Sequence, residues 1–324
     1  MRALLEKTVR RPLRRVALVA LCAAVVGGGA HALAAGSDRT LPNVALPTLG
    51  GSQLWADVAW DGGWRVQRHV WTGHARLLDR EDVRRAWGST EACLDALAAR
   101  ASGSEAPSAD APVAVVLHGL WRTRRSMGRL TAALEGAGFD VVDVSYPSAR
   151  GSIEAHAAQV AGLLDRLPGE GREVSFVTHS LGALVTRQLL AREGDAWRSR
   201  HRVRRAVFIA APNQGARLAE LGRRIPLLPW IYGEPMRQIA SGFTRELPAP
   251  PIPFLTVAGG RGDGEGWNPL VPGDDDGVVS VTEAQLEGAV AAHRVRAMHT
   301  VIMNHPATIA AALQFLRSGA VPPR

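Results

Sequence analysis

Val177-Thr178-His179-Ser180-Leu181-Gly182 is the stretch of sequence that decides the fold. Its first residue is the last residue of the predicted strand Val174–Val177, and it leads into an apolar stretch that continues through Leu190. A buried strand that turns into a helix at a serine is typical of a nucleophile elbow, G-x-S-x-G, which holds the serine hydroxyl clear of its neighbours. Thr178 replaces the first glycine, where strand and helix approach closely, so we expect tighter packing there. The pattern predicts Ser180 as a nucleophile, and the alternative is a serine that only caps a helix.

Strand-like and helix-like stretches alternate on both sides of this motif. Continuous apolar runs are typical of strands buried in a parallel sheet. Val113–Leu117 is such a run, and further strands rich in apolar residues are predicted at Val141–Val144, Val174–Val177, Val203–Ala210, Phe254–Ala258 and Val295–Met298. Apolar residues at helical spacing lie between these runs, and a closing helix is marked by Ile309, Leu313 and Leu316. The alternation predicts an α/β fold over residues 113–319, with a mostly parallel sheet covered by helices on both faces.

A glycine directly follows the first predicted strand. Gly119 permits a turn that aims the N–H of Leu120 inward. Paired with the N–H of Leu181, beside the predicted nucleophile, it would form an oxyanion hole.

Three consecutive aspartates lie in the turn Gly273–Val279, beyond the fifth predicted strand. A turn after a strand is where a triad of this kind receives its acid. Asp276 is the preferred acid because it directly precedes Gly277-Val278-Val279. Asp274 and Asp275 are interpreted as a solvated turn or a cation site.

Two histidines compete for the role of the base. His305 precedes Pro306, which is well suited to be the first residue of a helix, so it is interpreted as a helix-start residue. His299 directly follows the last predicted strand and is the preferred base. The resulting order of Ser180, Asp276 and His299 in the chain is one of the three known triad orders.

Six motifs together resemble bacterial α/β-hydrolases related to small lipases. They are Leu117-His118-Gly119-Leu120, Tyr146-Pro147-Ser148, Thr178-His179-Ser180-Leu181-Gly182, Pro212-Asn213-Gln214-Gly215, Pro272-Gly273-Asp274-Asp275-Asp276-Gly277 and His299-Thr300-Val301-Ile302-Met303. The resemblance covers roughly residues 112–318 and implies the α/β-hydrolase fold, with His299 as the base. It also implies a serine hydrolase that cleaves carboxylic esters through an acyl-enzyme on Ser180. The alternatives are an acyltransferase or amidase with the same triad, or a non-catalytic binding protein of this fold.

Residues 213–250, after the fourth predicted strand, are predicted to form a cap or lid. Within them, Ile225–Tyr232 is apolar and is interpreted as an acyl-binding wall or lid, or as a helix packed on the sheet. It favours a hydrophobic ester or lipid as substrate.

Gly259–Gly264 imitates a dinucleotide-binding motif, but Trp267-Asn268-Pro269 follows instead of a helix, so a loop is predicted.

Composition excludes several other chemistries. Lys7 is the only lysine, which excludes Schiff-base enzymes and Walker A loops that need a lysine in the folded part. The sequence contains no CxxC pair and no HExxH, so we predict neither metal nor cofactor. The formal net charge is +8, but residues 1–15 hold six basic residues against one acidic residue. The rest of the chain is close to balance, so we predict no nucleic-acid partner.

The N-terminus has the order of regions found in a secretory signal. Basic residues precede the apolar run Val16–Val26, and small residues follow, with A-x-A cleavage sites after Ala32 or Ala34. The alternative is an uncleaved membrane anchor over Val16–Ala35. Residues 1–35 are therefore predicted to be a signal peptide or an anchor. The chain is predicted to be exported, periplasmic or extracellular, with possible anchoring to the inner membrane.

A tryptophan-rich extension is predicted over residues 36–100, followed by a linker over 101–112. Five of the nine tryptophans lie between Trp55 and Trp87, and they either pack the extension onto the main domain or form a sugar- or lipid-binding platform. Residues 37–60 are predicted to be a loop, and Arg84–Ala99 a helix.

Overall fold

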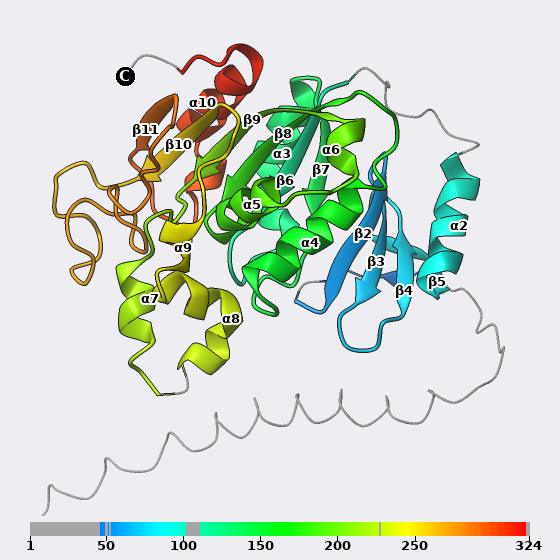
Figure 1. Cartoon of the computed structure of the whole chain (residues 1–324), viewed down its shortest axis with the longest axis horizontal. Coiled ribbons are helices and arrows are strands. Elements are labelled where there is room, and N and C mark those ends of the chain that lie inside the picture. Colours follow the sequence, from blue (N-terminus) through cyan, green and yellow to red (C-terminus); the bar gives the residue numbers. More distant parts are fainter. Residues whose placement is uncertain (1–45, 49–50, 52, 102–110, 227, 322–324) are drawn as a thin grey trace, which may run out of the picture. The chain divides into compact units, whose positions relative to one another are not determined.

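The computed structural model describes residues 46–48, 51, 53–101, 111–226 and 228–321 (Figure 1). The predicted signal or anchor over residues 1–35 lies outside the described residues, as does most of the predicted linker. Within the described ranges, no helix is long and apolar enough to cross a membrane.

Six parallel strands form the larger sheet, here called the main sheet, in the order β11-β10-β9-β8-β6-β7. Their bounds are β6 Val113–Leu117, β7 Asp140–Val144, β8 Glu173–His179, β9 Arg202–Ile209, β10 Phe254–Gly259 and β11 Ala291–Val295. The predicted strands are confirmed within two residues at each end, with the exception of the last one. The predicted α/β-hydrolase architecture is therefore confirmed.

The predicted last strand over Val295–Met298 is wrong, because β11 ends at Val295. Strand β11 lies at the edge of the main sheet and alternates between exposed and partly buried residues, with His293 and Arg294 in its middle. An edge strand does not need a continuous apolar run, so the apolar pattern failed to mark it. After Val295 the chain turns, with the N–H of Ala297 donating to the carbonyl of Val295 at 2.9 Å.

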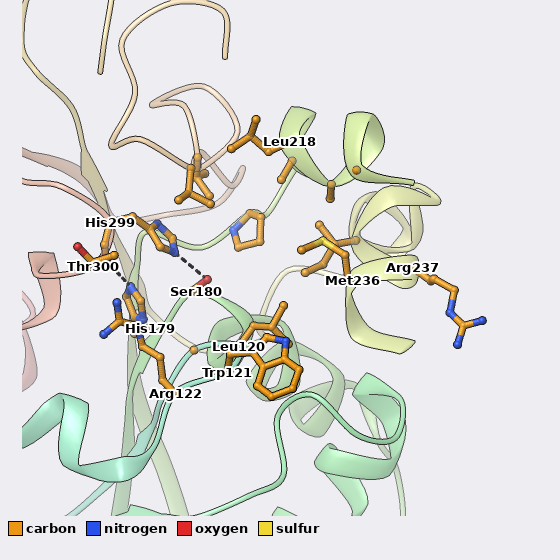
Figure 2. Close-up of a pocket in the computed structure, with 18 of the residues that line it drawn as sticks. Leu120, Trp121, Arg122, His179, Ser180, Leu218, Met236, Arg237, His299 and Thr300 are labelled. Atoms are coloured by element: carbon orange, nitrogen blue, oxygen red, sulfur yellow. Dashed lines mark hydrogen bonds between the residues drawn. The ribbon is translucent and has the colours of Figure 1, made fainter. Parts of the chain in front are cut away.

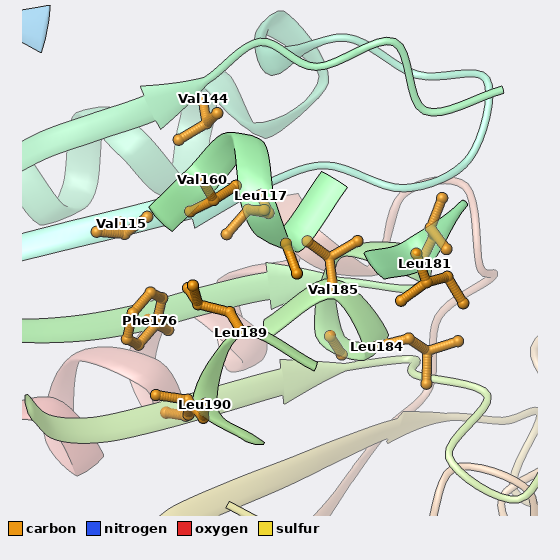
Figure 3. Close-up of a cluster of buried hydrophobic side chains, with 14 of the residues drawn as sticks. Val115, Leu117, Val144, Val160, Phe176, Leu181, Leu184, Val185, Leu189 and Leu190 are labelled. Atoms are coloured by element: carbon orange, nitrogen blue, oxygen red, sulfur yellow. The ribbon is translucent and has the colours of Figure 1, made fainter. Parts of the chain in front are cut away.

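Helices cover both faces of the main sheet because alternate strand residues point to opposite sides. Val113, Val115 and Leu117 of β6 pack with α4 (Ile153–Leu164) and α5 (Leu181–Ala191), and Figure 3 shows part of this cluster. Ala114 and Val116 face the other side. There they join α3 (Gly128–Gly136) and α10 (Pro306–Ser318).

Further elements lie in the connections between strands and after β11. These are η1 Arg124–Met127 after β6, α6 Trp197–Arg200 before β9, α7 Arg217–Gly222, α8 Leu228–Ala240 and α9 Phe243–Glu246 before β10, and η2 Ile302–Asn304 before α10. The described residues of the segment predicted as a cap or lid thus include α7, α8, which is kinked at Gly233, and α9. The segment predicted as a loop after β10 contains neither helix nor strand over residues 260–266.

The described part of the predicted extension folds into a five-stranded antiparallel sheet, here called the N-terminal sheet, in the order β1-β5-β4-β3-β2. Its elements are β1 Leu46–Pro47, β2 Trp55–Asp61, β3 Trp64–His69, β4 Ala75–Leu78, β5 Val83–Gly88 and the following helix α2 Thr90–Ala101. Val66, Leu77, Cys93 and Leu97 form a small core between the sheet and α2.

Two sequence predictions for this region are wrong. The loop predicted over residues 37–60 contains β2, and the helix predicted from Arg84 starts only at Thr90. Residues 84–88 belong to β5 instead, and Ser89 accepts a hydrogen bond from the N–H of Ala92 at 3.1 Å, as a helix-capping residue does. Strand β5 pairs with β4 and β1, and this non-local pairing overrode the local helical pattern.

The tryptophans of this region do not share one role. Trp60 is 3% exposed and belongs to the core cluster beneath the main sheet, so it packs the two sheets together. Trp71 is 67% exposed. An arginine lies over the ring of Trp71 and of each of the three others, namely Arg150 on Trp71, Arg76 on Trp55, Arg84 on Trp87 and Arg100 on Trp64.

Candidate active site

Ser180 lies between the last residue of β8 and the first residue of α5, in a backbone conformation that few residues other than glycine adopt. Its φ is 53° and its ψ −120°, which is the sharp turn expected of a nucleophile elbow. Gly182 is required at this elbow because an added Cβ would lie 2.7 Å from the carbonyl oxygen of Leu117. Thr178 is fully buried, and its hydroxyl donates to the carbonyl of Val207 on β9 at 3.4 Å, which shows how threonine is accommodated.

A continuous chain of hydrogen bonds joins the serine to a histidine and an aspartate (Figure 2 shows the serine and the histidine). The Nε2 atom of His299 lies 3.0 Å from the Oγ atom of Ser180. The Nδ1 atom of His299 lies 2.7 Å from Oδ2 of Asp276. Because a carboxylate only accepts, Nδ1 carries the proton, and in the neutral ring Nε2 is left to accept the serine proton. Asp276 is 1% exposed and His299 8%.

Backbone groups hold the carboxylate and the imidazole in place. Oδ1 of Asp276 accepts hydrogen bonds from the N–H groups of Val278 and Val279 at 3.0 and 2.8 Å. The N–H of His299 donates to the carbonyl of Asp276 at 2.8 Å. The turn that carries the acid is thus bonded to the turn that carries the histidine, although 23 residues separate them.

The competing residues have other partners. Asp275 accepts hydrogen bonds from the N–H groups of Asn268 and Gly277. Asp274 accepts hydrogen bonds from the N–H groups of Arg261 and Gly262. Both aspartates therefore stabilise the loops in which they lie. His305 is the N-cap of α10 and accepts from the N–H of Ala307 at 3.2 Å, as its place before Pro306 predicts. Among the described residues, no group of three or more histidine, cysteine or acidic side chains is placed to hold a metal ion.

The two residues whose N–H groups were predicted to form the oxyanion hole, Leu181 and Leu120, lie near Ser180. Leu181 is the first residue of α5, so its N–H is one of those that a helix leaves without an intrahelical partner. Leu120 follows β6 and lines the same cavity as the serine. The intervening Gly119 allows this approach, since an added Cβ would lie 2.8 Å from Nδ1 of His179 and 3.1 Å from Cβ of Ser180.

Three buried rings, those of His118, Tyr146 and His179, are not part of the hydrogen-bond chain but bond to backbone groups beside it. The ring of His118 stacks on Tyr146 at 4.4 Å, and Nδ1 of His118 donates to the carbonyl of Gly119 at 2.9 Å. Burial lowers the pKa of His118 to about 4. His179 donates from Nε2 to the carbonyl of His299 at 3.0 Å, and burial holds its pKa well below the usual value. Both rings are therefore neutral near pH 7 and act as spacers and donors.

Tyr146 is a site residue that its motif marked without assigning a role. Its hydroxyl donates to the carbonyl of His118, directly before the turn that bears Leu120. The sequence offers only the motif as a clue, because the contact joins the loops that follow two neighbouring strands, β6 and β7, and the two residues are 28 positions apart in the chain.

A cavity of about 370 Å³ opens above Ser180 and His299. Its walls are mostly apolar and include residues from α7, α8 and the turn after Asp276, namely Leu218, Ala219, Met236, Ile239, Val278 and Val279. Arg237 also lines the cavity, but Figure 2 shows its side chain pointing away from Ser180. The predicted cap segment thus contributes part of the cavity wall. Most of the apolar stretch Ile225–Tyr232 lies outside the side chains that the structure describes.

Comparison with solved structures places the chain near a lipase of Bacillus licheniformis, BlEst2. Its mature form aligns with a TM-score of 0.51 and 20% identity, over 66% of this chain and 94% of that one. Its propeptide form aligns with a TM-score of 0.52 and 19% identity, over 68% of this chain and 53% of that one. A sequence family described as a domain of unknown function (DUF7379) matches residues 147–231. A comparison with curated proteins finds no match.

Proposed function

We propose that this chain, which has the α/β-hydrolase fold, is a serine hydrolase that cleaves carboxylic esters through an acyl-enzyme on Ser180. The observation that carries the proposal is the hydrogen-bond chain from Ser180 through His299 to Asp276 at the floor of an apolar cavity. The lipase BlEst2 shares the fold, and the chemistry is inferred from the residues of this chain.

In the first step, Nε2 of His299 takes the proton of the Ser180 hydroxyl as its oxygen attacks the ester carbonyl carbon. The tetrahedral intermediate collapses when the bond to the alkoxy oxygen breaks, and His299 gives its proton to the departing alcohol. In the second step, water gives a proton to His299 as its oxygen attacks the acyl carbon. The bond between the acyl carbon and Oγ of Ser180 then breaks, His299 returns the proton to that oxygen, and the carboxylic acid leaves. Asp276 keeps the imidazole in the tautomer that this cycle needs and stabilises its charged form.

The negative charge that develops on the carbonyl oxygen would be held by the N–H groups of Leu120 and Leu181. The first stands on the turn after β6 and the second at the N-terminus of α5, where the helix dipole also favours an anion. Loss of one such donor typically costs about 3 kcal/mol in activation free energy.

The walls of the cavity support a hydrophobic acyl group as the part of the substrate that enters it. Leu218, Met236 and Ile239 bring apolar surface from the α7–α8 region to the serine. A series of p-nitrophenyl esters of increasing chain length tests this, and we expect octanoate to be preferred over acetate. A preference for acetate would count against a lipase.

The decisive experiment compares the full chain with Ser180→Ala. We expect a fluorophosphonate probe to label the unchanged protein but not the variant, and ester turnover to fall on the order of 10⁶-fold in the variant. Full turnover by Ser180→Ala would contradict the proposal. A binding protein that has the fold without the activity would not be labelled in either form, whereas an acyltransferase would be labelled and would transfer the acyl group to an added alcohol.

We also propose that the chain is exported, on the evidence of the basic and apolar order of residues 1–35. Cell fractionation followed by N-terminal sequencing tests this. A new N-terminus after Ala32 or Ala34 is expected for a signal peptide, and an intact N-terminus in the membrane fraction for an anchor.

A further inference from the structure

The turn that carries Leu120 is bonded to the N-terminal sheet at several points. We call residues 119–125, which follow β6 and include the first two residues of η1, the oxyanion loop. Asp82, in the turn between β4 and β5, accepts hydrogen bonds from Arg124 and from Nη2 of Arg125, the latter at 2.8 Å. Gln53, just before β2, donates from Nε2 to the carbonyl of Arg122 at 3.0 Å.

The same contacts reach the neighbouring loop after β7. Oε1 of Gln53 accepts a hydrogen bond from the N–H of Ala149 at 2.8 Å, and its Nε2 lies 3.1 Å from Oγ of Ser148. A single side chain of the N-terminal region thus joins the loops that follow two adjacent strands of the main sheet. Both loops leave the carboxyl edge of that sheet, where Ser180 also lies.

A buried chain of charges extends this attachment into the N-terminal sheet. Nη1 of Arg124 lies 2.6 Å from Oδ2 of Asp143 at the end of β7. Asp143 in turn binds Arg65 of β3 at 2.7 Å, and Arg65 binds Asp57 of β2 at 3.1 Å. The Arg65 side chain is only 3% exposed. Charged hydrogen bonds in such surroundings are short and directional, so they fix orientation as well as distance.

Few bonds within the oxyanion loop itself define its shape. The N–H of Arg122 donates to the carbonyl of Gly119 at 3.2 Å, and Trp121 has a φ of 56°, which is unfavourable for a large side chain. A loop with strained backbone keeps its conformation only when its surroundings hold it. The hydrogen bonds of Asp82 and Gln53 stabilise the conformation of this loop within a few residues of Leu120.

We propose that Asp82 and Gln53 are positioning residues that hold the oxyanion loop, so that the N-terminal sheet takes part in catalysis by fixing the N–H of Leu120. The inference rests on the proposed function, because it assigns that N–H to the oxyanion. Neither residue lines the cavity. They therefore act through the loop and not on the substrate.

Asp82→Asn is the first test, because asparagine tolerates the left-handed backbone found at this position, where φ is 63°. The amide cannot hold two guanidinium groups as the carboxylate does. We expect kcat for p-nitrophenyl ester hydrolysis to fall about 10- to 100-fold, as for a small misplacement of a catalytic group, with KM nearly unchanged. Asp140→Asn is the matched control, since Asp140 pairs with the buried Arg172 at 2.6 Å at the amino end of β7, the end of the strands opposite to Ser180.

Gln53→Glu provides a second variant if Asp82→Asn does not fold. A glutamate can still accept from the N–H of Ala149 but cannot donate to the carbonyl of Arg122. We expect kcat to fall about 10-fold or more, again with little change in KM. Rates of fluorophosphonate labelling measured on the same proteins are expected to fall in parallel, because the adduct also places an oxygen in the oxyanion hole.

The controls separate failure of this inference from failure of the proposed function. If the unchanged protein is neither labelled nor active, the proposed function fails. If the unchanged protein is active and both Asp82→Asn and Gln53→Glu keep its kcat, the positioning role is overturned. An equal fall of kcat in Asp140→Asn would also overturn it, because the effect would then follow general destabilisation and not the oxyanion loop.

Discussion

The two sheets of this molecule are stabilised in different ways. The main sheet buries apolar strands between helices on both faces, and every residue of β6 and β10 is buried. The N-terminal sheet has only a small apolar core, and beside the apolar contact of Trp60 it meets the rest of the chain through the buried polar groups of Asp57 and Arg65. Apolar burial is non-directional, whereas hydrogen bonds between charged groups specify geometry.

This difference separates two tasks. The main sheet supplies a rigid frame whose loops carry Ser180, Asp276 and His299. The N-terminal sheet adds contacts that favour one placement of the loops after β6 and β7, the first of which carries Leu120. Ion pairs that are buried this deeply contribute little net stability, because desolvation offsets most of their attraction. We therefore interpret these ion pairs as contacts that orient loops, and not as a main source of stability.

The largest effect that tests the comparison is expected within the loops of the main sheet. Asp276→Asn should lower kcat on the order of 10⁴-fold, because the amide would favour the wrong tautomer of His299. Thermal unfolding should change little. Asp275→Asn is the matched control, since Asp275 binds loop N–H groups and not the imidazole. A greater loss of kcat in Asp275→Asn than in Asp276→Asn would reverse the assignment of the acid.

A smaller effect is expected where the two sheets meet. Arg65→Met leaves Asp57 and Asp143 without their shared partner, and removing one member of a buried ion pair typically costs about 3–5 kcal/mol in the free energy of unfolding. Urea unfolding followed by fluorescence measures it. Arg204→Met is the control, because its pair with Glu173 is half exposed and should contribute less than about 1 kcal/mol. Equal losses in the two variants would show that burial of the pair at the interface has no special effect.

The smallest effect is expected from acid. Burial alone would raise the pKa of Asp82, but hydrogen bonds from Arg124 and Arg125 outweigh it and lower that pKa below the usual 3.8. Burial is likewise outweighed at Asp143, where Arg65 and Arg124 lower the pKa. Unfolding then takes up protons, so this stabilisation is fully present above about pH 4 and is lost as the pH falls through the folded-state pKa. We expect the unfolding midpoint in urea to fall below pH 4, and to fall less steeply in Asp82→Asn. Identical pH dependence in both proteins would contradict the pKa shift of Asp82.

Much of the main sheet could be predicted because its cues are local. A buried parallel strand is a short apolar run, and the elbow requires a serine between a strand and a helix with glycine at residue 182. The same cues failed at β11 and β5. The first is an edge strand that contains the partly buried His293 and the exposed Arg294, and the second lies next to a real helix whose pattern extends into it. Strand β11 pairs with β10, and β5 pairs with β1 as well as with its neighbour β4, so both depend in part on partners that lie far away in the sequence.

Sequence alone determined the class of fold, the position of Ser180 at a strand–helix turn, and the set of residues from which the acid and base could be chosen. Only the tertiary structure brought His299 within hydrogen-bond distance of both Asp276 and Ser180. It also decided that Asp82 and Gln53 bond to a loop 42 and 69 residues further along the chain. The reason is physical, because strand and helix patterns reflect burial on one face of a local element. Hydrogen bonds between distant polar side chains leave no periodic trace and exist only once the elements have packed.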